Sequence, residues 1–235
     1  MAAILEKQRV ILKFEDTVFT SAIRGIAESN EISLSICSGE LVMIRPARLE
    51  QTSGFADACA GIFPPTSGRI FFLGRTWPEL APDQANALRG RIGRVFRTGN
   101  WINHLSLMEN ILLSHLHHTR RPVRRLRDEA GRLAEQFGLP GLPLGLPGDF
   151  TEADLRRAAC VRAFLGRPLL ILLEEPTSGI YLEIISALMT AIREARERGA
   201  AVIWLTQKDS IWNDPTLPVT QQYRLVSGKL MEMTT

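Results

Sequence analysis

The sequence predicts an α/β protein whose parallel sheet is covered by helices on both faces. Residues 169–173 and 201–205 are runs of entirely apolar side chains, which is typical of strands buried on both faces. Between them, residues 182–198 carry apolar side chains at helical spacing. A strand, a helix and a second strand in this order favour a parallel sheet with crossover helices.

The rest of the chain divides into a strand-rich first third and a helical middle. Alternating or compact apolar runs predict strands over residues 10–14, 32–36, 41–44 and 70–73. Small residues predict a helix over 53–62. Residues 107–164 are helical in pattern and rich in arginine, with an interruption at the proline- and glycine-rich segment 138–148. A helical block inserted into the sheet follows from this order.

Composition excludes several classes of protein. The 235 residues are 45% hydrophobic and 23% charged, which is too apolar for disorder and matches one large domain or slightly more. No apolar run reaches the about 20 residues that a membrane-spanning helix needs, and Glu6 and Lys7 interrupt any signal peptide. Three cysteines argue against a disulfide framework and for a reducing cytosol. The net charge of +3 is too small for a dedicated nucleic-acid binder.

Two parts of the sequence resemble a known family. Residues 39–44, followed by 60–70, are similar to the strand, phosphate-binding loop and helix of ABC-transporter ATPases. Residues 162–179 are similar to their signature helix, Walker B strand and D-loop. The likeness covers nearly the whole chain. It implies a P-loop NTPase fold of the ABC ATPase type, with an antiparallel β subdomain and an inserted helical subdomain.

The resemblance implies a single ABC ATPase-like domain over residues 1–235. Its core would comprise about 1–97 and 166–235, and its helical subdomain about 98–165. A weaker likeness, to the ATPases of bacterial lipid transporters of the Mla/Mce type, rests on residues 95–101, 107–111 and 147–150.

The segment that matches the phosphate-binding loop, residues 46–54, has lost most of that loop's chemistry. In the family, the N–H groups of a glycine-rich loop wrap the phosphates and a lysine neutralises them. Here Thr52 stands at the lysine position, Pro46 lacks an N–H group, and Glu50 adds a negative charge.

Two residues of this loop keep some relation to the family pattern. Ser53 retains the magnesium-liganding hydroxyl position, and Gly54 follows it as the segment's only glycine. Arg48 is a candidate replacement for the lysine, although an arginine beside a backbone without glycine does not rebuild the loop.

The position of the Q-loop glutamine and the signature sequence also differ from the family. Arg97 stands where the glutamine is expected, either as a phosphate contact or as a contact to a partner subunit. The signature Leu-Ser-Gly-Gly-Gln is replaced by Phe-Thr-Glu-Ala-Asp over residues 150–154. Its carboxylates, Glu152 and Asp154, would repel a triphosphate.

The remaining motif positions follow the buried strands. Glu174 replaces the Walker B aspartate, Tyr181 the D-loop aspartate, and Gln207 the switch histidine. Glu175 alone matches the family, at the position of the general base. It is either a working base or a carboxylate satisfied by local N–H groups, and the second interpretation is favoured because a base needs a positioned phosphate.

Two further groups have a functional and a structural interpretation. The histidines His104, His115, His117 and His118 form either a metal site or, preferably, a solvated surface, because no cysteine or carboxylate completes the set nearby. An arginine run follows them, which either faces anionic lipid head groups or is simply solvated. It comprises Arg120, Arg121, Arg124, Arg125 and Arg127.

The sequence therefore predicts a degenerate subunit of a membrane transport complex that does not hydrolyse ATP and whose cargo is lipid or another hydrophobic molecule. The expected partners are a transmembrane permease and a second ABC ATPase subunit, either another copy or an intact paralogue. No metal and no tightly bound cofactor are expected, and Mg-ATP binding would be weak. The alternatives are an active ATPase using Arg48, Ser53, Glu174 and Glu175, and a soluble interaction module. The expected location is cytoplasmic, at the inner face of the cell membrane.

Overall fold

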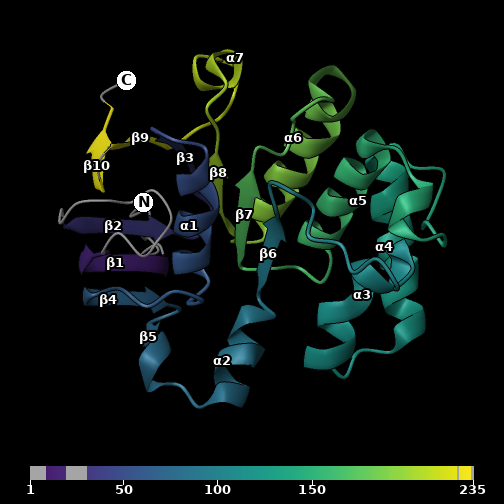
Figure 1. Cartoon of the computed structure of the whole chain (residues 1–235), viewed down its shortest axis with the longest axis horizontal. Coiled ribbons are helices and arrows are strands. Elements are labelled where there is room, and N and C mark those ends of the chain that lie inside the picture. The colour runs from purple at the N-terminus through teal and green to yellow at the C-terminus, as the bar shows by residue number, and fades with distance from the viewer. Residues whose placement is uncertain (1–8, 20–30, 227, 234–235) are drawn as a thin grey trace, which may run out of the picture.

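A computed structural model describes residues 9–19, 31–226 and 228–233. Glu6 and Lys7, on which the expectation about a signal peptide depends, lie outside these residues. Within them no helix is long and apolar enough to cross a membrane. Figure 1 shows two sheets side by side, with a group of helices packed beyond the second sheet.

The first sheet is antiparallel and has the strand order β2-β1-β4-β5. It comprises β1 (Val10–Val18), β2 (Ile32–Cys37), β4 (Ser67–Phe72) and β5 (Arg75–Thr76). Burial alternates along β2, where Ile32, Leu34 and Ile36 face the core, as expected for a sheet with one buried face. This sheet is the antiparallel β subdomain that the resemblance implied.

The second sheet has the order β10-β9-β3-β8-β7-β6. The strands β6, β7, β8, β3 and β9 run parallel, and β10 is an antiparallel edge. The bounds are β3 (Leu41–Pro46), β6 (Ile92–Val95), β7 (Leu170–Glu174), β8 (Ala201–Leu205), β9 (Gln221–Val226) and β10 (Lys229–Glu232). All of β7 and β8 is buried.

Helices cover both faces of this parallel sheet. The helix α1 (Glu50–Cys59) packs on the face that carries Leu170 and Leu172, whereas α5 (Glu152–Phe164) and α6 (Tyr181–Glu197) pack on the face of Ile171 and Leu173. The other helices are α2 (Pro82–Arg89), α3 (Leu107–His118), α4 (Val123–Gln136) and α7 (Asp209–Trp212), with single 3₁₀ turns at Trp77–Glu79 and Pro147–Asp149. In Figure 1, α3, α4 and α5 lie together beside the sheet.

The predicted fold class is confirmed, and the differences lie in individual elements. The helix predicted over 53–62 begins earlier, at Glu50, and ends at Cys59. Gly61, two residues later, adopts a positive φ of 64°. The strand β6 was not predicted because glycine and arginine occupy its centre. Gly93 is needed there, since a Cβ atom would lie 1.8 Å from the carbonyl oxygen of Ala163. The helix α2 was also not predicted.

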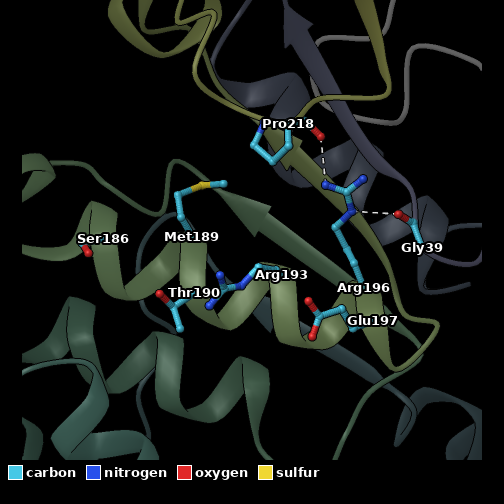
Figure 2. Close-up of a pocket in the computed structure, with 8 residues that line it drawn as sticks. All are labelled: Gly39, Ser186, Met189, Thr190, Arg193, Arg196, Glu197 and Pro218. Carbon is cyan, nitrogen blue, oxygen red and sulfur yellow. Dashed lines mark hydrogen bonds between the residues drawn. The ribbon is translucent and has the colours of Figure 1, made fainter.

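A cavity of about 610 Å³ lies beside the C-terminal half of α6. Figure 2 shows Arg196 reaching from this helix to two backbone carbonyl groups. Its Nε donates to Gly39 O at 2.7 Å, and a terminal nitrogen donates to Pro218 O at 2.9 Å. Arg196 therefore anchors α6 to the turn before β3.

Candidate site at the ends of the parallel strands

A buried arginine forms the centre of the polar cluster between α1 and the parallel sheet. Arg94 on β6 is 8% exposed and Glu174 at the end of β7 is fully buried. The Arg94 Nε donates to Glu174 Oε1 at 2.6 Å, and a terminal nitrogen lies 2.5 Å from Asp57 Oδ1. The other oxygen of Glu174 accepts a hydrogen bond of 2.6 Å from Ser53 Oγ. Both carboxylate oxygens of Glu174 are thus engaged within the protein.

The elements that hold this cluster follow from helix and sheet periodicity. Ser53 and Asp57 are four residues apart on α1 and so lie on the same face of the helix. Arg94 pairs with Leu172 in the parallel register of β6 and β7. Its second terminal nitrogen donates to Ser53 O at 3.4 Å. The Arg94 guanidinium also lies 4.3 Å from the ring centroid of Phe96, a distance at which a cation is attracted to the face of the ring.

The loop before α1 uses its own N–H groups internally. The amides of Gln51 and Thr52 donate to the carbonyls of Arg48 and Leu49 at 3.1 and 3.2 Å. The Arg48 amide donates to Gln51 Oε1 at 3.0 Å, and the Ala47 amide donates to Leu225 O at 2.9 Å. Three of these donors are turned into the start of the helix and the fourth, the Ala47 amide, donates to β9, so the four do not converge on a common point outside the protein.

The structure places the candidate residues of this loop in different surroundings. Thr52, at the lysine position, is fully buried, and its hydroxyl has no hydrogen-bond partner among the described residues. Arg48 is exposed, as is Glu50. Gly54 is buried within α1. Ser53 is the one loop residue that the structure brings into contact with Glu174.

Glu175 is 6% exposed and is held by the segment after β8. Its Oε2 accepts from Thr206 Oγ1 at 2.9 Å, and its Oε1 accepts from the Gln207 backbone N–H at 2.6 Å. The Gln207 side chain donates instead to Pro46 O at 3.1 Å. Glu175 also has a positive φ of 45°, an uncommon conformation for a residue with a side chain. The carboxylate is thus satisfied by local donors.

Two arginines of α5 donate hydrogen bonds to the segment that follows β6. Arg156 donates to the carbonyls of Phe96 and Arg97 at 3.2 and 3.1 Å. Arg162 donates to Gly99 O at 2.6 Å and stacks over Trp101, with its guanidinium carbon 4.2 Å from the ring centroid. Burial lowers the pKa of Arg162 to about 10, so the side chain stays cationic at neutral pH.

A cavity of about 470 Å³ lies between this segment, the start of α5 and the turn before α6. The Nε of Arg97 is buried and has no hydrogen-bond partner in the described part of the chain. Trp101 is half-buried because it packs against the helical core beneath Arg162. The cavity is lined by Arg97, Thr98, Gly99, Trp101, Glu152, Ala153, Leu155, Arg156, Ala159, Ser178, Gly179 and Ile180.

The segment at the signature position forms an ordinary helix start. The Thr151 hydroxyl accepts from the Asp154 N–H at 3.1 Å and so caps α5, as a threonine does at this position in many helices. Glu152 lies exposed in the first turn. At the D-loop position, the Tyr181 hydroxyl lies 3.4 Å from Asp214 Oδ2. Burial and this carboxylate raise the pKa of Tyr181.

The expectation of a solvated histidine surface holds for some of its members. His104 and His117 are exposed, but His115 is 6% exposed because its ring packs against Gly166. Nothing is described for the His118 side chain. No group of three or more potential metal ligands occurs among the residues that the structure describes.

Sequence reasoning missed Arg94, Asp57 and Thr206. One signal could have found Arg94: a single arginine among the apolar residues of a short strand has to reach a carboxylate if the strand is buried. Asp57 lies one helical turn after Ser53, so the spacing alone placed it on the same face. Thr206 directly follows the buried strand β8.

Comparison with known proteins agrees with this architecture. The family model described as ABC transporter matches residues 52–178, more than half of the chain. The octopine permease ATP-binding protein P of Rhizobium meliloti is 26% identical over 190 residues, covering 75% of this chain and 71% of that protein. The glutamate/aspartate import ATP-binding protein GltL of Escherichia coli (strain K12) is 26% identical over 178 residues, covering 76% and 73%.

The fold is also that of solved structures of this kind. The dimeric structure of MJ0796, a bacterial ABC transporter cassette, superposes with a TM-score of 0.82 at 20% identity, covering 95% of this chain and 98% of that one. The chain therefore belongs to the ABC transporter family, in which it corresponds to the ATP-binding subunit of a membrane transport system.

Proposed function

We propose that this chain is a non-hydrolysing subunit of an ABC transport complex. The observation that carries the proposal is the Arg94 guanidinium, which contacts Glu174, Asp57 and Ser53. The family pattern assigns the Ser53 and Glu174 positions to Mg²⁺. A guanidinium and a divalent cation cannot both occupy one small carboxylate cluster, because like charges at this distance repel strongly in a buried setting. The residues present therefore do not fit a magnesium-bound nucleotide.

The loop before α1 supports the same proposal. A triphosphate needs convergent N–H donors, and four amides of this loop already have partners within the protein, at 2.9 to 3.2 Å. Thr52 supplies no positive charge and is buried. Glu175 accepts hydrogen bonds from Thr206 and Gln207, which supports a structural role for this carboxylate. The alternative of an active ATPase built on Arg48 lacks a supporting contact, since Arg48 is exposed.

We further propose that the subunit binds a transmembrane permease without nucleotide, at the inner face of the cell membrane. Two relatives are named as a permease ATP-binding protein and an import ATP-binding protein, which supports a permease partner. The cavity beside Arg97 and Trp101 supplies the surface, because a buried guanidinium nitrogen without an acceptor favours an interface residue that completes it. A second ABC ATPase subunit, self or intact, is the other proposed partner.

The cargo and the membrane contact are the least constrained parts of the proposal. A lipid or another hydrophobic molecule is proposed from the sequence likeness of residues 95–101 and 107–111 to lipid-transport ATPases. Contact with an anionic membrane surface is proposed from the exposed arginines that flank the start of α4: Arg120, Arg121, Arg124, Arg125 and Arg127.

Phosphate release from Mg-ATP tests the proposal directly. The purified chain is expected to release phosphate no faster than buffer, and Glu175→Gln to give the same baseline. The comparison controls for a contaminating ATPase, which the substitution would not affect. A turnover that Glu175→Gln abolishes would show a working general base and would overturn the proposal.

A further inference from the structure

We propose that an arginine-lined cavity at the opposite edge of the parallel sheet binds a small ligand that carries two or more phosphate groups. The cavity has a volume of about 690 Å³. Among the residues that the structure describes, its lining includes five arginines and no aspartate or glutamate: Arg9, Arg75, Arg91, Arg121 and Arg167. We call it the arginine pocket.

The arginine pocket is separate from the candidate site already described. Arg91 directly precedes β6, and Arg167 lies three residues before β7, so the pocket adjoins the N-terminal ends of these parallel strands. Ser53, Glu174 and Glu175 lie where the strands end. Figure 1 shows β6 and β7 starting at the lower edge of the sheet and pointing upward, toward the end where α1 begins. The inference therefore does not depend on the proposed function.

Backbone contacts bring the arginines together from separate parts of the chain. The Arg91 carbonyl accepts from the Leu169 N–H at 2.9 Å, which holds the starts of β6 and β7 side by side. The Leu73 N–H donates to Ile11 O at 2.9 Å and so ties the turn before Arg75 to the strand that follows Arg9. Arg167 has a positive φ of 60°, an uncommon conformation for a residue with a side chain.

Four of these five arginines have no ion-pair partner in the part of the chain that the structure describes. The Arg121 guanidinium pairs with Glu129, whose other oxygen accepts from the Gly166 N–H at 3.1 Å. Arg9, Arg75, Arg91 and Arg167 have no side-chain hydrogen bond or ion pair within the described residues. Guanidinium groups gathered around one cavity repel each other, so an anion that enters it relieves this repulsion.

The chemistry of the lining selects the class of anion. A guanidinium presents a planar fork of donors that matches the oxygens of phosphate, and four unpaired forks exceed what one phosphate group requires. A volume of about 690 Å³ is within the range of about 300–1,000 Å³ of small-molecule sites. No phenylalanine, tyrosine or tryptophan of the described ranges lines the pocket, so these residues do not form the stacking surface that single-stranded nucleic acid uses. Leu73, Leu88 and Leu169 form an apolar wall.

Titration of the full chain with inorganic tripolyphosphate tests the pocket. We expect saturable binding that weakens as the salt concentration rises, because exposed arginines supply the attraction. The double variant Arg91→Gln/Arg167→Gln should weaken binding at least about tenfold, since it removes two charge-assisted contacts. The matched control, Arg193→Gln/Arg198→Gln on and beside α6, removes the same charge from exposed positions and should change the affinity less than about twofold.

Three outcomes would overturn the proposal. The first is the absence of saturable binding, and the second is an equal loss of affinity in both double variants, which would indicate a response to net charge alone. The third concerns the loop before α1: if Arg48→Gln abolishes binding and the arginine-pocket variant retains it, the anion site is that loop. Thermal unfolding midpoints of all variants confirm that each one is folded.

Vesicles distinguish the two sources of such a phosphate group. Phosphatidylcholine vesicles with and without phosphatidate are incubated with the chain and sedimented. Recruitment that requires phosphatidate, is competed by tripolyphosphate and is lost in Arg91→Gln/Arg167→Gln assigns the pocket to a lipid head group. Binding of tripolyphosphate without such recruitment assigns it to a free phosphorylated ligand. Either result supports the pocket as a phosphate site.

Discussion

The Nε of Arg94 lies 2.6 Å from Oε1 of Glu174, and the glutamate side chain is completely buried. The same guanidinium also contacts Asp57, so one cation bridges two carboxylates on neighbouring elements. A buried charge that loses its partner is far more costly than a surface charge. Removing Arg94 would therefore leave the buried Glu174 carboxylate without its cation and destabilise the sheet.

The first prediction concerns the stability that this pair provides. Arg94→Leu should lower the free energy of unfolding by about 3–5 kcal/mol, because it leaves Glu174 buried and unpaired. The double variant Arg94→Leu/Glu174→Leu should be more stable than Arg94→Leu by at least about 1 kcal/mol, since it removes both charges. Urea denaturation followed by circular dichroism measures both differences.

An exposed arginine on the same chain segment provides the control for this experiment. Arg91→Leu removes the same charge three residues away, where the side chain is exposed, and should change the free energy of unfolding by no more than about 0.5 kcal/mol. If Arg94→Leu is as mild as this control, Arg94 does not balance Glu174 and the argument against a magnesium site loses its basis.

The contrast between Arg94 and the buried strands shows what the sequence could and could not predict. The runs at β7 and β8 are apolar throughout, so their burial and parallel pairing follow from local pattern. The strand β6 contains Gly93 and Arg94, which read as a turn and a surface residue. Their roles depend on α5 and on Glu174, which come about 70 to 80 residues later. Such long-range contacts leave no periodic signal.

The candidate site also has features that the sequence could predict and features that it could not. The loss of the lysine at Thr52 and of the glycines before Gly54 was visible, because the family pattern fixes their spacing. The partners of Glu175 could not be predicted in this way, because Thr206 and Gln207 follow the neighbouring strand β8 and lie about 30 residues away in the sequence. The half-buried state of Trp101 was also not visible, because it depends on Arg162 stacking over the ring.

The second prediction is that restoring a single lysine does not restore nucleotide binding. Thr52→Lys should give no saturable heat with Mg-ATP at micromolar concentrations, because the loop amides donate internally and position 52 is buried. Isothermal titration calorimetry should use the Arg91→Gln/Arg167→Gln background, so that the arginine pocket does not contribute a signal. Micromolar affinity in Thr52→Lys would show that the loop can turn its N–H groups toward phosphate.

The third prediction follows from the ionisation of a buried thiol. Burial raises the pKa of Cys160 from its ordinary value of 9.0 to about 12. Above pH 9 the unfolded chain loses the thiol proton and the folded chain keeps it, so the stability that this group contributes falls as the pH rises from about 9 to about 12. The contribution is fully present below pH 9.

Comparison with Cys160→Ala isolates this effect from other titrating groups. Between pH 8 and pH 10, the unmodified chain should lose about 1 kcal/mol of unfolding free energy relative to Cys160→Ala. Urea denaturation at the two pH values measures the difference. Parallel loss in both proteins would mean that the Cys160 thiol ionises as readily in the folded state as in the unfolded chain.

The last prediction concerns docking to a membrane subunit. Arg97→Glu combined with Trp101→Ala should remove the complex with a permease, because the first reverses the charge at the cavity and the second deletes part of its wall. Aromatic and arginine residues often dominate binding energy at interfaces. Purification of the tagged chain from detergent-solubilised membranes, with and without ATP, measures the complex, which should be the same in both conditions.

A matched control, Leu144→Ala with Arg198→Glu, alters an exposed leucine and an exposed arginine elsewhere and should leave the complex intact. Trp101 also supports Arg162, so the single variant Arg97→Glu, which keeps the stacked pair, separates lost docking from lost stability. A complex that survives both Arg97 variants, or one that forms only with ATP, would contradict nucleotide-independent docking through this cavity.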